Sequence, residues 1–322
     1  MFGIRTSIIV ALLSLATGGA GAVGCGASTQ QQQSARQNNQ ASNKNPTPTP
    51  TPAESENVSS DIKILTQGQH SSVGESFVAV ARDIETYKEL RGLDGNLPAL
   101  SADAFNRTAV VAAFLGQRRT GGFGVEITRT ADGAVRINEA SPPRDAITTQ
   151  VLTTPYKIVS VPVENERPLR LELNQTWRDS MRPYKVSSGE FTMSGGFAGR
   201  SENMKLEGSL AVMRQANLAT FIFDLKGTGG TKVRELKEAA TGIVQAGGQA
   251  RLARFNAGSL IEPPANLLQA KGQFNNNESD LTLSFESLPS NISDAFQGRG
   301  RLTATATGPP PPKRALNKED VM

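Results

Sequence analysis

The side chains that most often perform catalysis are scarce in this sequence. Its 322 residues include one histidine, His70, and one cysteine, Cys25. Two serines follow His70 in a polar stretch, but the local sequence positions no acid that could orient the imidazole as a general base. One His and one Cys are also too few to ligate a zinc-type ion. We therefore expect a protein that is not an enzyme and that uses no metal or cofactor.

Two further segments hold ligand-binding residue types without the full pattern of a site. Gly227–Lys232 (GTGGTK) has the glycines and the lysine of a phosphate loop, but a P-loop needs a glycine directly before its lysine. Asp94-Gly95-Asn96 lacks the remaining ligands of an EF-hand loop. We expect Gly227–Lys232 to form a tight turn, followed by a short helix over Val233–Ala240.

The surroundings of Cys25 predict a different chemistry, namely acylation. Arg5 supplies a positive charge, Ser7–Ala16 is apolar, and small residues lead to Cys25 in the tetrapeptide AVGC. This order is typical of a secretory signal, and AVGC resembles the bacterial lipobox, whose cysteine carries diacylglycerol and an acyl chain after cleavage. We predict a signal peptide over residues 1–24 and lipidation at Cys25. The alternative is an ordinary cleaved signal with an incidental cysteine.

The predicted anchor also predicts a location. Each methylene buried in a membrane contributes about 0.8 kcal/mol, so two or three acyl chains hold a protein there permanently. Gly26 follows the cysteine, and no Asp retention signal is present. By resemblance to Gram-negative sorting rules, we expect a lipid-anchored protein of the bacterial cell envelope, at the outer membrane. The formal net charge of +4 gives no electrostatic signature of nucleic-acid binding.

Composition divides the rest of the chain. Residues 25–60 consist largely of Gln, Asn, Ser, Thr and Pro and predict a disordered tether, stiffened by the alternating prolines of Thr47–Pro52. Residues 308–322 begin with Gly-Pro-Pro-Pro-Pro and predict a disordered tail. Between them we expect two β-rich domains, over residues 61–177 and 185–307.

The first domain is expected to be α+β with one short helix. The apolar spacing in Asp83–Arg91 predicts that helix. The continuous apolar run Thr108–Leu115 predicts a strand buried on both faces, and Asp132-Gly133 predicts a hairpin turn. Val151-Leu152 suggests a further short strand. The second domain shows short strands separated by Gly, Asn and Ser, so we expect an antiparallel barrel or sandwich and a mainly β protein overall.

The stretch Val110–Ile127 (VVAAFLGQRRTGGFGVEI) resembles the signature of the C-terminal domain of protease complex subunit PrcB-like proteins. That family shows an apolar strand, a glycine, one or two basic residues, Thr-Gly-Gly-aromatic and a second strand. The matching positions here are Gly116, Arg118, Arg119, Thr120, Gly121, Gly122 and Phe123, where Phe123 replaces the commoner Tyr. A later family segment is similar to Thr149–Val159, and the resemblance covers roughly residues 66–174.

The resemblance implies association rather than catalysis, because the family's namesake is a lipoprotein that partners an exported protease. It implies partner binding by Arg118, Arg119, Thr120, Gly121, Gly122 and Phe123. The loop's own chemistry allows the same role, since two glycines permit a close approach, arginines bind carboxylates and Phe123 offers an apolar contact. The alternative is a glycine-rich turn that lets Phe123 join Val125 and Ile127 in the core.

A second cluster lies near the expected domain junction, where Arg167, Arg178 and Arg182 accompany Trp177 and Tyr184. Arginine beside aromatic rings forms either a binding hot spot or cation–π packing of a linker.

Our hypothesis for the function is a lipid-anchored accessory protein that binds an exported protease and stabilises or restrains it. The alternative hypothesis is an envelope structural or adhesive lipoprotein that binds glycan or another surface protein.

Overall fold

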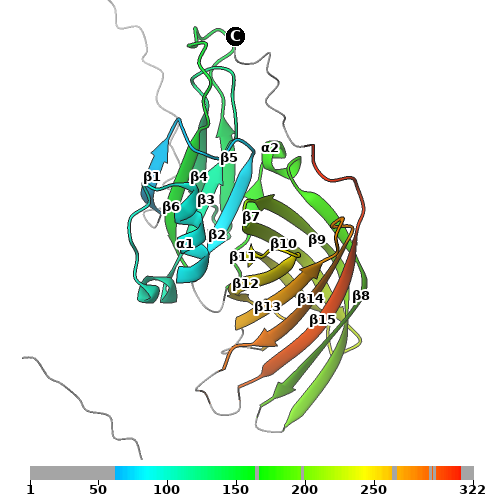
Figure 1. Cartoon of the computed structure of the whole chain (residues 1–322). Coiled ribbons are helices and arrows are strands. Elements are labelled where there is room, and N and C mark those ends of the chain that lie inside the picture. Colours follow the sequence, from blue (N-terminus) through cyan, green and yellow to red (C-terminus); the bar gives the residue numbers. More distant parts are fainter. Residues whose placement is uncertain are drawn as a thin grey trace, which may run out of the picture. The chain divides into compact units, whose positions relative to one another are not determined.

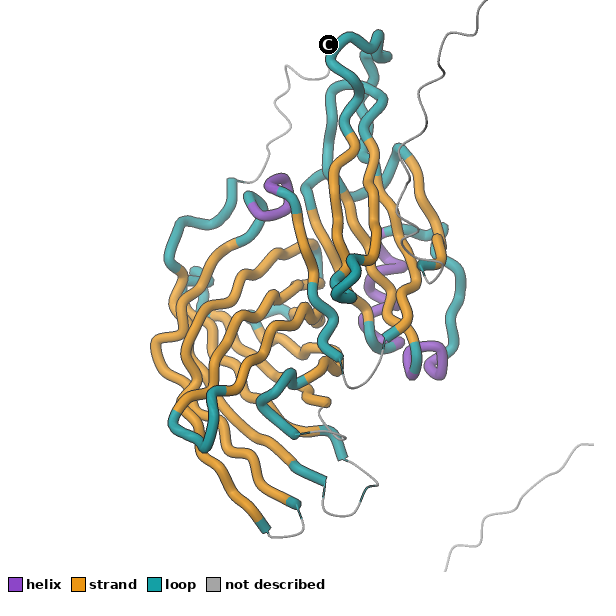
Figure 2. Tube along the Cα trace, turned by 180° about the vertical axis from the view of Figure 1, so that it is seen from behind, coloured by secondary structure: helices purple, strands orange, loops and turns teal. Residues whose placement is uncertain are grey.

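The computed structural model of the chain describes residues 62–163, 167–196, 199–262, 267–289, 292 and 295–312. This part of the chain is mainly β, as predicted, and consists of two strand systems that share a packed boundary (Figure 1). Helices are few and short (Figure 2). The predicted signal peptide, the lipidation site Cys25, the tether of residues 25–60 and residues 313–322 of the predicted tail lie outside the described residues.

The first strand system is built from a four-stranded and a three-stranded sheet. β1, β6, β3 and β2 are antiparallel in that order, while β4, β5 and β7 form the smaller sheet, in which β5 and β7 are parallel. In chain order the elements are β1 (Lys63–Gly68), β2 (Phe77–Ala81), α1 (Ile84–Leu93), the 3₁₀-helix η1 (Ala102–Asn106), β3 (Thr108–Phe114), β4 (Gly124–Arg129), β5 (Val135–Ala140), β6 (Tyr156–Pro162), β7 (Leu171–Leu173) and α2 (Gln175–Arg178).

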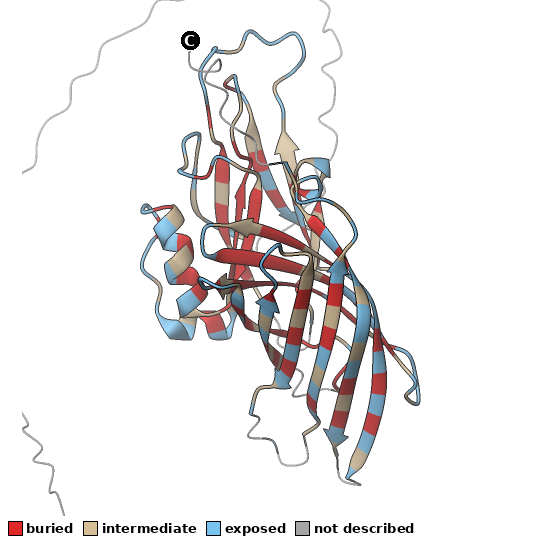
Figure 3. Cartoon of the chain, turned by 45° about the vertical axis from the view of Figure 1, so that its right-hand side comes forward, coloured by how far each residue is buried: buried red, intermediate tan, exposed pale blue. Residues whose placement is uncertain are grey.

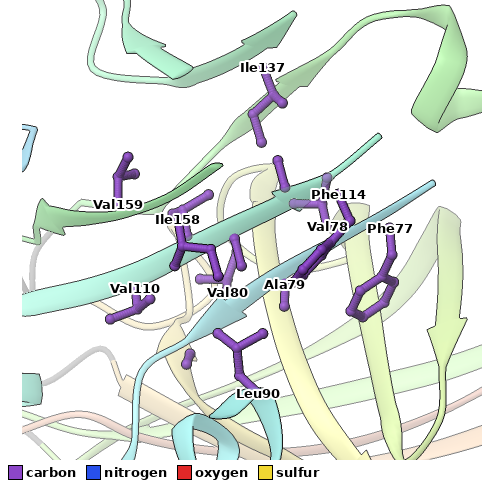
Figure 4. Packing of buried hydrophobic residues seen from close by; sticks show 14 of the residues in the cluster. Phe77, Val78, Ala79, Val80, Leu90, Val110, Phe114, Ile137, Ile158 and Val159 are labelled. Atoms are coloured by element: carbon purple, nitrogen blue, oxygen red, sulfur yellow. The ribbon is translucent and has the colours of Figure 1, made fainter. Parts of the chain in front are cut away.

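The predicted helix and the predicted buried strand are both confirmed here. Asp83 caps α1 because its carboxylate accepts a hydrogen bond from the Thr86 N–H at 2.7 Å. β3 lies inside the larger sheet and is buried along nearly its whole length. Its two faces are covered by different elements, since Leu90 of α1 and Ile137 of β5 lie on opposite sides of these strands (Figure 4).

The second strand system is a closed antiparallel barrel, so the expected barrel is confirmed and the sandwich is not. Its order is β10-β11-β12-β13-β14-β15-β8-β9. The strands are β8 (Arg182–Gly195), β9 (Arg200–Gln215), β10 (Leu218–Thr228), β11 (Arg234–Val244), β12 (Gln249–Asn256), β13 (Leu267–Phe274), β14 (Asp280–Ser287) and β15 (Gln297–Ala306).

Buried and exposed residues alternate along the long barrel strands (Figure 3). The inward residues include five phenylalanines whose ring centroids lie 5.5–6.4 Å from their neighbours, namely Phe221, Phe223, Phe255, Phe274 and Phe285. The centre of the barrel is therefore a packed aromatic core, as is usual for a barrel of eight strands.

The predicted helix over Val233–Ala240 is wrong, because Arg234–Ala240 belongs to β11 and Val233 lies in the turn before it. The segment is rich in Glu, Leu, Lys and Ala, which favour helix when no other contact decides. Here Arg234–Ile243 pairs residue by residue with the preceding strand β10. That pairing places Leu236 and Ala240 in the barrel core and Ala239 in the core of the first strand system. Burial on both faces of a strand outweighs a propensity of a few tenths of a kcal/mol per residue.

The two strand systems meet where the edge strand β2 lies against the outside of β10 and β11. The Val80 N–H donates to Thr241 Oγ1 at 2.6 Å, and Thr220 Oγ1 donates to the Val78 carbonyl at 2.6 Å. The two hydroxyls are 2.8 Å apart. Because the Thr220 proton already goes to Val78, the Thr241 hydroxyl donates to Thr220. The relay satisfies polar groups of a fully buried sheet edge.

Apolar pairs flank this threonine pair on the barrel surface. Leu218 lies opposite Ile243, and Ile222 lies opposite Ala239, in the register that also aligns Thr220 with Thr241. These four side chains pack into the core of the first strand system rather than into the barrel. The boundary is thus a continuation of one hydrophobic core, with a hydrogen-bonded centre.

A buried charged pair lies at the same boundary. Arg82 Nη2 is 3.3 Å from Glu238 Oε1, and both side chains are almost fully buried. The geometry makes no hydrogen bond between those two atoms. The other carboxylate oxygen of Glu238 accepts the Leu169 N–H at 2.7 Å. Burial raises the pKa of Glu238 to about 8, because desolvation outweighs the attraction of Arg82 and the hydrogen bonds from backbone N–H groups.

This raised pKa predicts a fold that loses stability as the pH rises. The folded state retains a proton that an unfolded Glu238, near pKa 4.5, releases. The free energy of unfolding should therefore fall between about pH 5 and pH 8, by up to about 1.4 kcal/mol per pH unit, and level off above that range. Urea unfolding at a series of pH values measures this slope.

Glu238→Gln should flatten this slope, because the amide does not titrate. Glu207→Gln, at an exposed carboxylate whose pKa is lowered by Lys205, serves as the matched control and should leave the slope in this pH range unchanged. An unaltered slope in Glu238→Gln would contradict the assignment.

Candidate functional site

The predicted partner-binding loop Arg118–Phe123 joins β3 to β4 and is covered along one side by residues 149–153. The Arg118 N–H donates to the Thr153 carbonyl at 2.8 Å, and the Thr153 N–H donates back to Arg118 at 2.9 Å. The Gly121 N–H donates to the Thr149 carbonyl at 2.9 Å. Thr120 takes part through its carbonyl, which accepts from Thr153 Oγ1 at 3.2 Å. Hydrogen bonds between the loop backbone and residues 149–153 therefore hold the loop in one conformation.

Both glycines of the loop are required by this packing. A Cβ on Gly121 would lie 2.6 Å from Thr149 Oγ1, and Gly122 has a φ of +87° with Pro142 3.0 Å from the position of a Cβ. Val151 and Leu152, predicted as a strand, lie in this covering segment without strand structure, so that prediction is wrong. Of this segment, only the neighbouring Thr153 forms a β-bridge, and its partner is Arg118 of the loop.

The structure separates the two arginines of the loop. Arg118 points inward and forms a two-pronged ion pair with Glu139, with Nε–Oε1 and Nη2–Oε2 distances of 3.2 and 3.1 Å. Thr176 Oγ1 donates to the same carboxylate at 2.6 Å. The guanidinium carbon of Arg118 lies 5.7 Å from the ring centroid of the half-buried Phe123. Arg119, in contrast, is exposed.

Arg118 and Phe123 line a cavity of about 620 Å³, which we call the junction pocket. Its other wall comes from the barrel, where Arg182 lies over Tyr184 at 5.8 Å and Arg214 pairs with Glu278. The Tyr184 hydroxyl donates to the Glu278 carbonyl at 2.8 Å. Burial raises the pKa of Tyr184 to about 12, so the ring stays neutral.

The junction pocket unites residues from both clusters that the sequence singled out. Arg118 and Phe123 come from the loop, and Arg182 and Tyr184 come from the junction cluster. Trp177 is instead fully buried, with its indole N–H donating to the Phe114 carbonyl at 2.9 Å. The cation–π packing expected as one alternative for this cluster therefore occurs between Arg182 and Tyr184. Both residues lie in the wall of the junction pocket.

Several pocket residues were not singled out from the sequence, among them the polar residues Glu139, Thr176, Arg214 and Glu278. Glu139 had a signal, because it continues the inward alternation of Val135 and Ile137 along β5 and is a charge at a core-facing position. Arg214 and Glu278 meet only because barrel closure brings β9 beside the turn between β13 and β14. Nothing in their local sequence indicates that contact.

A cluster of exposed apolar side chains lies outside the pocket. Ile147 is fully exposed, and Val151 and Leu152 are 46% and 39% exposed. We call these three residues the apolar tip. Since residues 149–153 pair with the loop, the tip lies next to Arg119 and Gly122, the exposed members of the loop.

The phosphate-loop-like segment and His70, which the sequence also singled out, lie elsewhere in the fold. Gly227 and Thr228 end β10, and Gly229–Lys232 lies in the turn before β11. This turn surrounds a carboxylate of the chain itself, because the Thr231 N–H and hydroxyl both donate to Glu202. The hydrogen bonds from Arg234 and Thr231 lower the pKa of Glu202 to about 2, against the effect of burial. His70 is exposed. No set of three or more His, Cys, Asp or Glu in the described part of the chain is arranged to hold a metal ion.

The family described as PrcB C-terminal matches residues 109–162 of this chain. The match runs from β3 to the end of β6 and includes the loop Arg118–Phe123 and the apolar tip. This stretch is thus PrcB-like, and the barrel lies outside it. A comparison with curated proteins gave no match. Among the described helices, none has the length and apolar character needed to cross a membrane.

The ion pair between Arg118 of the loop and Glu139 of β5 predicts that loss of Glu139 lowers the stability of the fold. Glu139→Gln removes the charge that balances the half-buried Arg118 and should lower the free energy of unfolding by about 1–3 kcal/mol. Glu172→Gln is the matched control, because it removes the acidic partner of Arg136 in an exposed pair of the same sheet. That change should cost less than about 1 kcal/mol. Equal losses in urea unfolding would contradict the role assigned to Glu139.

Proposed function

We propose that the protein is a lipid-anchored accessory subunit that binds an exported protease through its PrcB-like region. The observation that carries this proposal is the match over residues 109–162, which coincides with the loop and tip just described. The sequence holds one histidine and one cysteine and lacks a recognisable catalytic motif, which supports a binding role. The acylation motif at Cys25 supports an envelope location.

The contact surface for the protease consists of Arg119 and the apolar tip. Arg118, Phe123 and the glycines hold the loop in shape, because their side chains or backbone are engaged within the fold. Exposed aliphatic side chains gathered at one place favour a protein–protein contact, and a neighbouring cation favours an acidic rim on the partner. Residues 141–155 carry the tip away from the barrel, so a large partner can reach it (Figure 1).

Substitution of the tip tests the contact surface. Membranes from cells that carry the tagged full chain are solubilised, the protein is captured, and co-purifying protease activity is measured on a labelled protein substrate. Val151→Asp with Leu152→Asp should abolish the captured activity, because two charges in the contact exclude burial. Both residues are already exposed, so the fold should persist.

Val233→Asp is the control, since it places one such charge at an exposed aliphatic residue in a turn of the barrel. It should retain the captured protease. Capture without protease activity, or the same activity with the tip variant, would contradict the proposal. Recovery of a glycan or of a surface protein that depends on the barrel would instead favour the structural or adhesive alternative.

The anchor makes a separate prediction. Cys25→Ala should move the protein from the membrane fraction to the soluble fraction, because Cys25 is the only cysteine that can carry lipid. Fractionation followed by immunodetection measures the shift. Membrane retention at the level of the unaltered chain would contradict lipidation as the means of anchoring.

A further inference from the structure

The end of the barrel leads the chain directly to the junction pocket. After β15, the Thr307 N–H still donates to the Pro183 carbonyl at 3.0 Å, which continues the alignment of β15 with β8. Four prolines follow, and a proline has no N–H with which to extend that pairing. The chain therefore leaves the barrel at this point, and Pro310, Pro311 and Pro312 line the mouth of the pocket.

The burial of this segment has the period of a polyproline II helix. Gly308 and Pro311 are half-buried, whereas Pro309, Pro310 and Pro312 are exposed. Polyproline II has three residues per turn, so residues 308 and 311 lie on the same side. Residues 308 and 311 thus face the protein most closely, while Pro310 and Pro312 also contribute to the lining of the pocket, as when an extended proline-rich peptide lies along a groove.

The chemistry of the pocket complements such a segment. A run of prolines offers carbonyl acceptors but no N–H donor. The pocket offers three guanidinium groups, from Arg118, Arg182 and Arg214. Each guanidinium has five N–H donors, which is more than the number of acceptors described above for it. The Arg182 Nε–H is buried and has no hydrogen-bond partner among the described residues. Phe123, which is only half-buried, adds an aromatic surface on which proline rings pack, and Tyr184 supports Arg182 from the buried side of the wall.

We propose that the junction pocket is a binding site for proline-rich peptide in the polyproline II conformation, and that residues 308–312 of the chain occupy its mouth in cis. The tail is a resident ligand, which another proline-rich segment must displace. A segment joined by so short a connection has an effective concentration of about millimolar, so it competes with all but strong or abundant ligands. This site is independent of the tip and of the proposed protease contact.

Peptide binding to tail variants tests the proposal. The probe is a fluorescein-labelled Gly-Pro-Pro-Pro-Pro-Lys peptide, and the control probe carries Ser at the four Pro positions. Fluorescence anisotropy is measured with the detergent-solubilised full chain, with a chain that ends at Gly308, and with a chain that ends at Pro312. The last variant is the matched control, because it loses residues 313–322 but keeps the prolines.

The chain that ends at Gly308 should bind the proline probe about ten-fold more tightly, or more, than either chain that keeps the prolines. It should prefer the proline probe to the serine probe. In that background, Arg214→Gln should weaken binding about three-fold or more by removing a donor. Arg214 is about one-third exposed, so the substitution should leave the fold intact. Phe123→Ala should weaken binding further.

Three results would overturn the proposal: no binding by the chain that ends at Gly308, equal affinity for the two probes, or equal affinity with and without the prolines. Unfolding curves of each variant establish that it is folded before its affinity is compared. Because the probe contains no protease, failure here leaves the proposed function standing, and loss of protease capture in the tip variant leaves this site standing.

Discussion

The hydrogen-bonded contact between β2 and the threonine pair of the barrel is the interaction on which the rest of the architecture depends. β2 ends one sheet, and an uncovered edge strand leaves unpaired backbone groups exposed to other chains. Thr220 and Thr241 satisfy the Val80 N–H and the Val78 carbonyl, while apolar pairs on both sides exclude water. Without this contact, the barrel would expose the apolar outer face of β10 and β11 to solvent. The sheet would likewise expose its apolar edge strand β2. The junction pocket lies along the same boundary, since its two walls belong to the two strand systems.

Three arginines that are buried or largely buried are each met by a carboxylate from another segment of the chain. Arg118 meets Glu139, Arg234 meets Glu202 and Glu262, and Arg82 meets Glu238. The first two arrangements form hydrogen bonds and stabilise the ionised state. The third does not, and desolvation there favours a protonated carboxyl. The same chain therefore contains both a fixed scaffold for the PrcB-like loop and a boundary where burial raises the pKa of a carboxyl.

The PrcB-like region and the barrel contribute different things to recognition. The loop Arg118–Phe123 is held rigid by pairing with residues 149–153, and rigidity lowers the entropy lost when a partner binds. Its exposed side, with Arg119 and the apolar tip, suits a folded partner. Its inner side, with Arg118 and Phe123, forms half of a pocket that the barrel completes and that suits an extended segment. One loop thus supports two surfaces because its successive side chains point in opposite directions.

The sequence by itself determined the mainly β class, the helix after Asp83, the buried strand β3 and the importance of the loop Arg118–Phe123. These features depend on local patterns: apolar periodicity, a capping side chain and glycines at a turn. It also contained the signal of Glu139, a charge at an inward position of β5. Only the tertiary structure decided that Arg234–Ala240 is a strand, because pairing with β10 and burial on both faces outweigh helix propensity. Only barrel closure brings Arg214 to Glu278, and only the packing of the two strand systems brings the loop to the pocket that Tyr184 also lines, since contacts between segments this far apart in the chain have no local pattern.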